Sequence, residues 1–170
     1  MASILDQVFD HEEALQLVTE AKKRQLPEPK STKPIFLKIL GPPIAKKRAR
    51  FFKKGNYVGS YNPQETEEGR WMLEVMTQLP NHRSLIKGTL YLKITFIMPI
   101  TKGWAKYKMQ MLRDGEEIPH TKTPDLDNLI KFVKDCLTGV IWKDDSQVYQ
   151  IMATKVYGLD PETIIVIGQK

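Results

Sequence analysis

The stretch that decides the fold of this chain runs from Thr123 to Gln147 and reads TPDLDNLIKFVKDCLTGVIWKDDSQ. Between Pro124 and Gly139 its apolar residues recur at helical spacing, which predicts a helix over residues 127–137. The apolar residues expected on one face of this helix are Leu126, Leu129, Ile130, Val133 and Leu137. We therefore expect that face to belong to the core of the domain.

Strand and helix patterns alternate on both sides of this helix. Strands are predicted over residues 34–40, 57–61, 88–98, 140–142, 147–157 and 163–167, and helices over residues 63–79 and 104–112. His82 and His120 are predicted to lie on solvated loops between these elements, although His120 is close enough in sequence to the acids of the opening stretch to approach them. The expected fold class is α/β of the α+β type, a single domain over residues 34–170 in which helices flank a mixed β-sheet.

Residues 1–33 are predicted to be an appendage to this domain. Asp10 to Arg24 has the apolar stripe of an amphipathic helix, with acidic residues in its first turn and basic residues in its last. The proline-containing QLPEPKSTKP that follows indicates a linker that ends near Lys33. We expect the apolar stripe to pack on the main domain or on a protein partner.

Composition limits the class of protein. The chain has 170 residues, which suits one domain, and its single cysteine, Cys136, excludes an internal disulfide and a CxxC zinc site. The favoured interpretation of Cys136 is a small, buried apolar residue. No stretch approaches the ~20 apolar residues of a membrane span, and the N-terminus lacks the pattern of a signal peptide. We therefore expect a cytoplasmic protein that does not contact a membrane.

A run of basic residues predicts a negatively charged partner. The chain carries 26 Lys and Arg against 20 Asp and Glu, a net charge of +6, and six of the basic residues crowd one loop without an acid. They are Lys46, Lys47, Arg48, Arg50, Lys53 and Lys54. Such a run would bind the phosphates of a polyanion and release counterions, although a solvated loop without a partner is equally consistent with it. Phe51 and Phe52 lie within the run and could stack on bases, but core packing is the favoured interpretation.

The acidic residues of the opening stretch predict a metal site. Asp125 and Asp127 lie where the helix starts, Lys131 follows one turn later, and Asp144 and Asp145 come after a short apolar run. Mg²⁺ and Mn²⁺ bind carboxylate oxygens, so these acids could share a cation if the chain folds back there. Taken one at a time, the same residues could instead be a helix cap at Asp127, a turn residue at Asp125 and a strand-turn pair.

The order of these residues resembles the signature of RusA-type Holliday junction resolvases. The likeness lies in the segment His120 to Gln147, which contains Pro124-Asp125-Leu126-Asp127-Asn128-Leu129, Lys131 and Asp144-Asp145-Ser146-Gln147, and in the upstream Gly41-Pro42-Pro43 with the basic loop after it. It spans about residues 34–157, and the long acidic motif is its specific part. Lys47 and Ala49 stand where relatives often have glycine and proline, and the residues before Lys33 are not part of the family's core.

The resemblance implies a RusA-like fold and a homodimer that cuts four-way DNA junctions with Mg²⁺, for which Mn²⁺ can substitute. It implies that Asp125, Asp127 and Asp145 are catalytic metal ligands and that Asp144 lies beside them. Lys131 would stabilise the transition state or help to orient the attacking water. The basic loop would hold the DNA. It further implies a bacterial or phage-encoded protein of the cytoplasm, which acts on the nucleoid in DNA recombination and repair.

Two other functions are open at the level of the sequence. The chain could be a non-catalytic module that binds branched DNA and recruits repair or replication proteins through the helix at Asp10 to Arg24. It could also be a metal-dependent nuclease that cuts flapped or other branched DNA with the same acids. A binding module would still bind junctions after the acids are replaced, and its wild-type form would not cut them.

Overall fold

A computed structural model describes residues 33–80 and 84–170 of the chain. The predicted helix at Asp10 to Arg24, the linker after it as far as Thr32, and His82 lie outside the described residues. Within these two ranges, no helix is long and apolar enough to cross a membrane.

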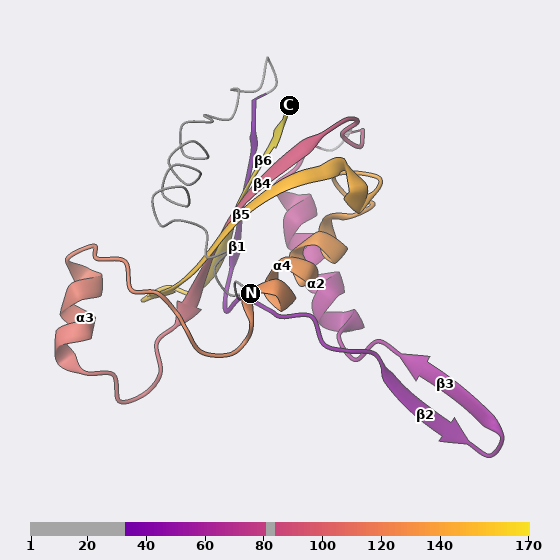
Figure 1. Ribbon diagram of the computed structural model, residues 1–170, viewed down its shortest axis with the longest axis horizontal. Coiled ribbons are helices and arrows are strands. Elements are labelled where there is room, and N and C mark those ends of the chain that lie inside the picture. Colours follow the sequence, from indigo (N-terminus) through magenta and orange to yellow (C-terminus); the bar gives the residue numbers. More distant parts are fainter. Residues whose placement is uncertain (1–32, 81–83) are drawn as a thin grey trace, which may run out of the picture.

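A four-stranded sheet forms the centre of the domain (Figure 1). Its strands, in spatial order, are β1 (Ile35–Leu40), β6 (Glu162–Gln169), β4 (Leu90–Pro99) and β5 (Val148–Gly158). β4 and β5 run parallel, whereas β6 is antiparallel to both β1 and β4. The sheet is therefore mixed, as the sequence predicts. A parallel pair needs a long crossover, and the acidic stretch lies within the crossover from β4 to β5.

Two helices cover one face of this sheet. α2 (Glu65–Thr77) contacts β1 and α4 (Leu126–Leu137), and α4 also contacts β5. Figure 1 shows both helices on the same side of the sheet, whereas α3 (Lys106–Arg113) lies away from them, beyond one end of the strands. Each of these three helices of the described residues is predicted from the sequence, with slightly different ends.

The core lies between the sheet and the two covering helices. The buried side chains of β4 are Leu90, Leu92, Ile94, Phe96 and Met98, and those of α4 are Leu129, Phe132, Val133, Cys136 and Leu137. The predicted apolar face of α4 is thus confirmed at three positions, whereas Leu126 and Ile130 are only partly buried. Phe132, which the predicted face leaves out, packs edge-on against Trp71 of α2 with the ring centroids 5.8 Å apart.

The buried position predicted for Cys136 is confirmed. The residue is 2% exposed, and burial raises the pKa of its thiol to about 12. The reactive thiolate is therefore suppressed at neutral pH, and Cys136 acts as a packing residue.

A second, two-stranded sheet projects from the domain as a hairpin (Figure 1). It pairs β2 (Arg50–Lys54) with β3 (Tyr57–Tyr61) through a turn at Gly55, whose φ of 62° suits glycine. β3 is a predicted strand, but the loop expected at β2 is wrong, because main-chain pairing with β3 orders a segment that lacks apolar alternation. Phe51 and Phe52 are 77% and 44% exposed, so the prediction that they pack in the core is also wrong.

The strand predicted at residues 140–142 is wrong. This segment is a compact turn after α4, in which the Gly139 N–H donates to the Trp142 carbonyl at 2.7 Å and the Ile141 N–H donates to the Leu137 carbonyl at 2.9 Å. Ile141 and Trp142 are buried. Their apolar character therefore reflects packing beneath the end of the helix. A run of only three apolar residues does not distinguish such a buried turn from a strand.

The packing of Phe132 leads to a stability prediction. Replacing it in Phe132→Ala should lower the free energy of unfolding by roughly 3–5 kcal/mol, because the change leaves a cavity between α2 and α4. Urea denaturation followed by circular dichroism measures the loss. Phe51→Ala removes the same side chain from the exposed hairpin and should change the free energy by less than about 0.5 kcal/mol. Equal losses in the two variants would contradict the core described above.

Candidate functional site

Asp125 and Asp127 lie at the N-terminal end of α4 with free carboxylates. Asp125 is the N-cap residue in an extended conformation (φ −71°, ψ 146°), but its side chain makes no capping hydrogen bond. Asp127 lies in the first turn, so the capping position considered for it belongs to Asp125. Both residues are exposed, and neither carboxylate has a polar partner in the described part of the chain. Both are therefore available to a ligand, where the backbone N–H groups of the helix favour negative charge.

Lys131 lies one turn after Asp127, on the same side of α4. It is exposed, and no acid among the described residues pairs with it. Because no acid of the described chain neutralises its positive charge, the Lys131 ammonium is available to pair with a negatively charged ligand at this end of the helix.

Lys155 of β5 holds the loop that leads into Asp125. Its Nζ donates to the carbonyl oxygens of Lys122 at 2.7 Å and Pro124 at 2.5 Å. The backbone of the same strand also binds this loop, since the His120 N–H donates to the Lys155 carbonyl at 2.9 Å. Lys155 is not among the residues predicted from the sequence, because its position in a strand gives no signal that its side chain reaches a loop more than thirty residues earlier.

The solvated position predicted for His120 is wrong. The residue is buried, and its ring packs on Tyr157 with the centroids 4.4 Å apart. Burial, together with the nearby charge of Lys155, lowers the pKa of the imidazole below its usual value. Its Nδ1 has no hydrogen-bond partner among the described residues. His120 is therefore a neutral packing residue beneath the loop, because the pairing of this loop with β5 draws it inward.

Asp145 lies beside the C-terminal end of α4. Its Oδ1 accepts hydrogen bonds from Thr138 Oγ1 at 2.5 Å and Trp142 Nε1 at 3.2 Å, and its Oδ2 pairs with Lys134 Nζ at 2.9 Å. Burial alone would raise the pKa of this carboxyl, but the hydrogen bonds from Thr138, Lys134 and Trp142 outweigh it and lower the pKa below its usual range. Asp145 is therefore an anion whose lone pairs are largely satisfied by its own chain.

Asp144 has a local structural role. Its Oδ1 accepts a hydrogen bond from the Ser146 N–H at 2.8 Å, and the Gln147 side chain accepts one from the Asp144 N–H at 3.1 Å, which together form a capping box. The hydrogen bonds from Ser146 lower the pKa of Asp144. This box starts the short 3₁₀ helix Asp145–Gln147 and so fixes the direction in which Asp145 leaves the turn.

The structure separates the predicted acids into two groups. α4 has 12 residues, which makes it roughly 18 Å long at about 1.5 Å per residue, with Asp125 at one end and the partners of Asp145 at the other. Across residues 33–80 and 84–170, no three Asp, Glu, His or Cys side chains lie together as metal ligands would. Asp125 and Asp127 fit a hard divalent cation by donor type and by availability, but Asp145 does not join them within one chain.

Lys46 ties the basic segment, residues 44–54, to both covering helices. Its Nζ pairs with Glu68 of α2 at 2.9 Å and with Asp135 of α4 at 2.8 Å. Its backbone N–H donates to the carbonyl of Asn128 at 2.9 Å. Asn128 directly follows Asp127, so the basic segment leaves the domain within one helical turn of the free acids.

Gln64 holds the same segment from the other side. It is fully buried at the start of α2; its amide nitrogen donates to the Ala45 carbonyl at 2.9 Å, and its amide oxygen accepts from the Lys47 N–H. A buried amide that satisfies two backbone groups of a passing segment orders that segment. Gln64 is not among the residues predicted from the sequence, since a glutamine before a helix resembles any polar residue at a helix N-terminus.

The six predicted DNA-binding residues divide into two groups. Lys46 is bound by Glu68 and Asp135 as described, and Lys47 lies 3.4 Å from Glu67 across an exposed pair. The other four are exposed and have no acidic partner in the described part of the chain: Arg48, Arg50, Lys53 and Lys54. These four, all on the hairpin or just before it, form the positive surface that is free to meet phosphate.

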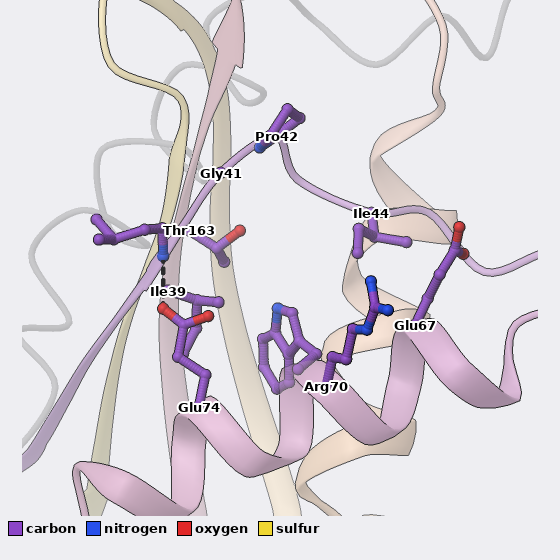
Figure 2. A pocket seen from close by; sticks show the side chains of 10 residues that line it. Ile39, Gly41, Pro42, Ile44, Glu67, Arg70, Glu74 and Thr163 are labelled. Atoms are coloured by element: carbon purple, nitrogen blue, oxygen red, sulfur yellow. Dashed lines mark hydrogen bonds between the residues drawn. The ribbon is translucent and has the colours of Figure 1, made fainter.

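A pocket whose lining includes none of these six residues lies between β1 and α2 (Figure 2). Ile39, Trp71 and Thr163 contribute to its lining, and Figure 2 shows Arg70 and Glu74 on the α2 side. The Glu74 carboxylate is used by the fold, because it accepts a hydrogen bond from the Leu40 N–H at 2.9 Å. None of the predicted acids lines this pocket, and we assign it no part in the site.

The hydrogen bonds of Asp145 predict a dependence of stability on pH. Because its pKa is lowered in the folded chain, its contribution is full above the unfolded value of about 3.9 and is lost as the pH falls through the folded value. Asp145→Asn should therefore lower the free energy of unfolding by about 1–2 kcal/mol at pH 7, and this difference should shrink below about pH 4. Urea denaturation at several pH values measures it, with Asp160→Asn, in an exposed turn, as the control for loss of one charge. A difference that grows on acidification would refute the assignment.

The two bonds from Lys155 predict how firmly the Asp125 loop is held. Lys155→Met keeps the apolar stem but removes the ammonium, so hydrogen exchange of the amides in residues 118–125 should accelerate while that of β6 stays unchanged. Exchange followed by mass spectrometry reads both regions at once. Lys93→Met, at an exposed lysine of β4, is the matched control. Unchanged exchange in residues 118–125 of Lys155→Met would show that Lys155 does not order the loop.

Comparison with known proteins identifies the family of this chain. The family model described as Endodeoxyribonuclease RusA matches residues 41–168. The Uncharacterized protein YqaN of Bacillus subtilis (strain 168) is 28% identical over 133 residues, which cover 77% of this chain and 93% of that protein. Because the family model spans the basic segment, the whole of α4 and the Asp145 turn, this chain belongs to the RusA family of endodeoxyribonucleases.

Proposed function

We propose that this protein is a structure-selective endodeoxyribonuclease that resolves four-way DNA junctions by Mg²⁺-dependent hydrolysis of paired phosphodiester bonds, in DNA recombination and repair. The observation that carries the proposal is the hydrogen bond from the Lys46 N–H to the Asn128 carbonyl, at 2.9 Å. It fixes the start of a basic segment next to two free carboxylates, Asp125 and Asp127. Positive charge to hold a DNA backbone and oxygen ligands to hold a cation therefore meet at one end of α4.

Asp125 and Asp127 are the residues that would hold the cation. When bound, Mg²⁺ (or Mn²⁺ in its place) would polarise the scissile phosphate and lower the pKa of an attacking water. Lys131 would offset the negative charge that grows on the phosphate, since no acid of the described chain neutralises it. Lys155 would keep Asp125 in place through its bonds to the loop.

The basic segment would position the DNA. Arg48, Arg50, Lys53 and Lys54 are exposed and free of acids, so they can contact phosphates along an arm of the junction. Lys46, by contrast, would act chiefly by anchoring the segment, because its ammonium already pairs with Glu68 and Asp135. This division assigns DNA contact to four of the six predicted residues and anchorage to the other two, Lys46 and Lys47.

The role of Asp145 links the proposal to a homodimer. Within one chain Asp145 lies at the opposite end of α4 from Asp125, and its own neighbours satisfy it. A second copy is the simplest source of a further carboxylate for the cation, and two copies would present one site to each of two opposed strands. Light scattering should then give twice the 19.6 kDa mass of the chain.

The separation of the acids also favours a second candidate. A non-catalytic module that binds branched DNA would keep the basic segment and would not need a gathered metal site, in keeping with the absence of a three-ligand group among the described residues. The two functions differ in one respect that an assay reads directly. Only the nuclease cuts the junction, and only when Mg²⁺ is present.

The test uses a labelled immobile junction, with Mg²⁺ or with EDTA. Asp125→Asn should slow the paired incisions by roughly 100-fold or more while binding in EDTA is kept or strengthened, because a carboxylate that repels phosphate is gone. Asp160→Asn, an exposed acid between β5 and β6, should cut at the wild-type rate. If wild-type protein binds the junction but makes no Mg²⁺-dependent incisions, the binding module is correct. Incision of flapped DNA in preference to the junction would instead favour the other branched substrate.

A further inference from the structure

The hairpin gathers three aromatic side chains on one of its faces. Phe52 lies opposite Gly59 in the register of β2 and β3, and Tyr57 and Tyr61 lie two residues to either side of that glycine. Because side chains alternate along a strand, all three rings point to the same face, and Phe51 points to the other. The ring centroid of Phe52 lies 6.0 Å from that of Tyr57 and 6.4 Å from that of Tyr61.

Gly59 is what allows the Phe52 ring to lie across the hairpin. A Cβ at this position would be 2.6 Å from Cζ and 2.8 Å from Cε1 of Phe52. Any larger residue at 59 would therefore push the ring away from its place between the two tyrosines. The glycine thus shapes the three rings into one surface, which we call the aromatic face (Phe52, Tyr57 and Tyr61).

The aromatic face is exposed on a hairpin that projects from the domain. Tyr57 and Tyr61 are 65% and 49% exposed, in addition to the exposure of Phe52 given above. Figure 1 shows that, among the described residues, neither the labelled helices nor the strands of the main sheet cover the hairpin. Three rings held together in contact with water do not form a core, but they suit the stacking of nucleobases. Any base can stack on an aromatic ring, so this contact does not depend on the DNA sequence.

The charges around the aromatic face favour a nucleic acid as the partner of this surface. Arg50 and Lys54 lie on the same face of β2 as Phe52, one on each side of it. The sequence from Lys46 to Tyr61 contains no acid. A second copy of this chain, with a net charge of +6, would bring like charge to the hairpin, whereas a DNA backbone brings the opposite charge.

We propose that the aromatic face stacks on a nucleobase exposed at the branch point of the DNA, while Arg50 and Lys54 hold the flanking phosphates. The inference rests on the proposed function and names how that function would tell a branched substrate from a linear one. A linear duplex keeps its bases stacked on one another and offers only phosphates to the hairpin. A junction or a single strand offers base faces as well.

The test compares two phenylalanines of one strand that point to opposite faces. Phe52→Leu keeps an apolar side chain but removes the ring from the aromatic face, and Phe51→Leu makes the same change on the other face. Binding of the full chain is measured by fluorescence anisotropy in EDTA with an immobile junction, a single strand and a linear duplex. Phe52→Leu should weaken binding to the junction and the single strand by about fivefold or more and leave duplex binding unchanged. Phe51→Leu should match the wild type on all three DNAs.

Two further variants separate stacking from phosphate contact. Gly59→Ala should weaken junction binding as Phe52→Leu does, because the new methyl group displaces the Phe52 ring. Both variants should keep the wild-type salt dependence, since no phosphate contact is lost. Arg50→Ala should instead reduce the slope of log affinity against log salt by roughly 0.9 on every DNA.

The outcomes distinguish this inference from the proposed function. If the wild type binds and cuts the junction but Phe52→Leu binds it equally well, or Phe51→Leu loses as much, the aromatic face does not stack on bases. If Phe52→Leu lowers the molar mass measured by light scattering, the face is an interface between copies and the inference is overturned. The melting temperature should not change in either variant, because the hairpin lies outside the core. Failure of the wild type to prefer a junction over a duplex would overturn the proposed function itself.

Discussion

The ion pairs of Lys46 with Glu68 and Asp135 are the interaction on which the arrangement of this site depends. Burial by itself would lower the pKa of Lys46, but the bonds with Asp135 and Glu68 outweigh it and raise the pKa, so the ammonium stays charged. A partly buried charge that loses one partner is strongly destabilised, which makes the position of Lys46 hard to shift. Because Glu68 belongs to α2 and Asp135 to α4, this one side chain fixes the basic segment to both helices.

α4 serves the core and the site at once. Its apolar face packs beneath the sheet, while its exposed side carries the free carboxylates at one end and the partners of Asp145 at the other. A rigid helix cannot shorten, so the length of α4 keeps Asp145 from Asp125 within one chain. In the function that we propose, a second copy of the chain would therefore supply the further carboxylate for the cation. The oligomeric state is thus part of the proposed chemistry.

The parts of the fold that follow from short-range patterns could be predicted from the sequence. The alternation along β4 and the helical spacing along α4 report which side of each element is buried, and both agree with the structure. The strand predicted at Val140 to Trp142 is wrong because this run is too short to show a pattern. Three apolar residues fit a strand and a buried turn equally well. The loop predicted at β2 is wrong because main-chain hydrogen bonds to β3 order this segment, and such bonds do not depend on the side-chain pattern.

The sequence by itself determined the alternating elements, the core faces of β4 and α4, and which residue types gather around the start of α4. Only the tertiary structure decided which of the charged residues are free. Lys46 and Asp145 look like Arg48 and Asp125 in the sequence, yet the fold pairs the first two and leaves the last two exposed. The reason is that the partners of Lys46 and Asp145 come from other elements, and a contact between elements depends on how they pack rather than on the spacing of residues within one of them.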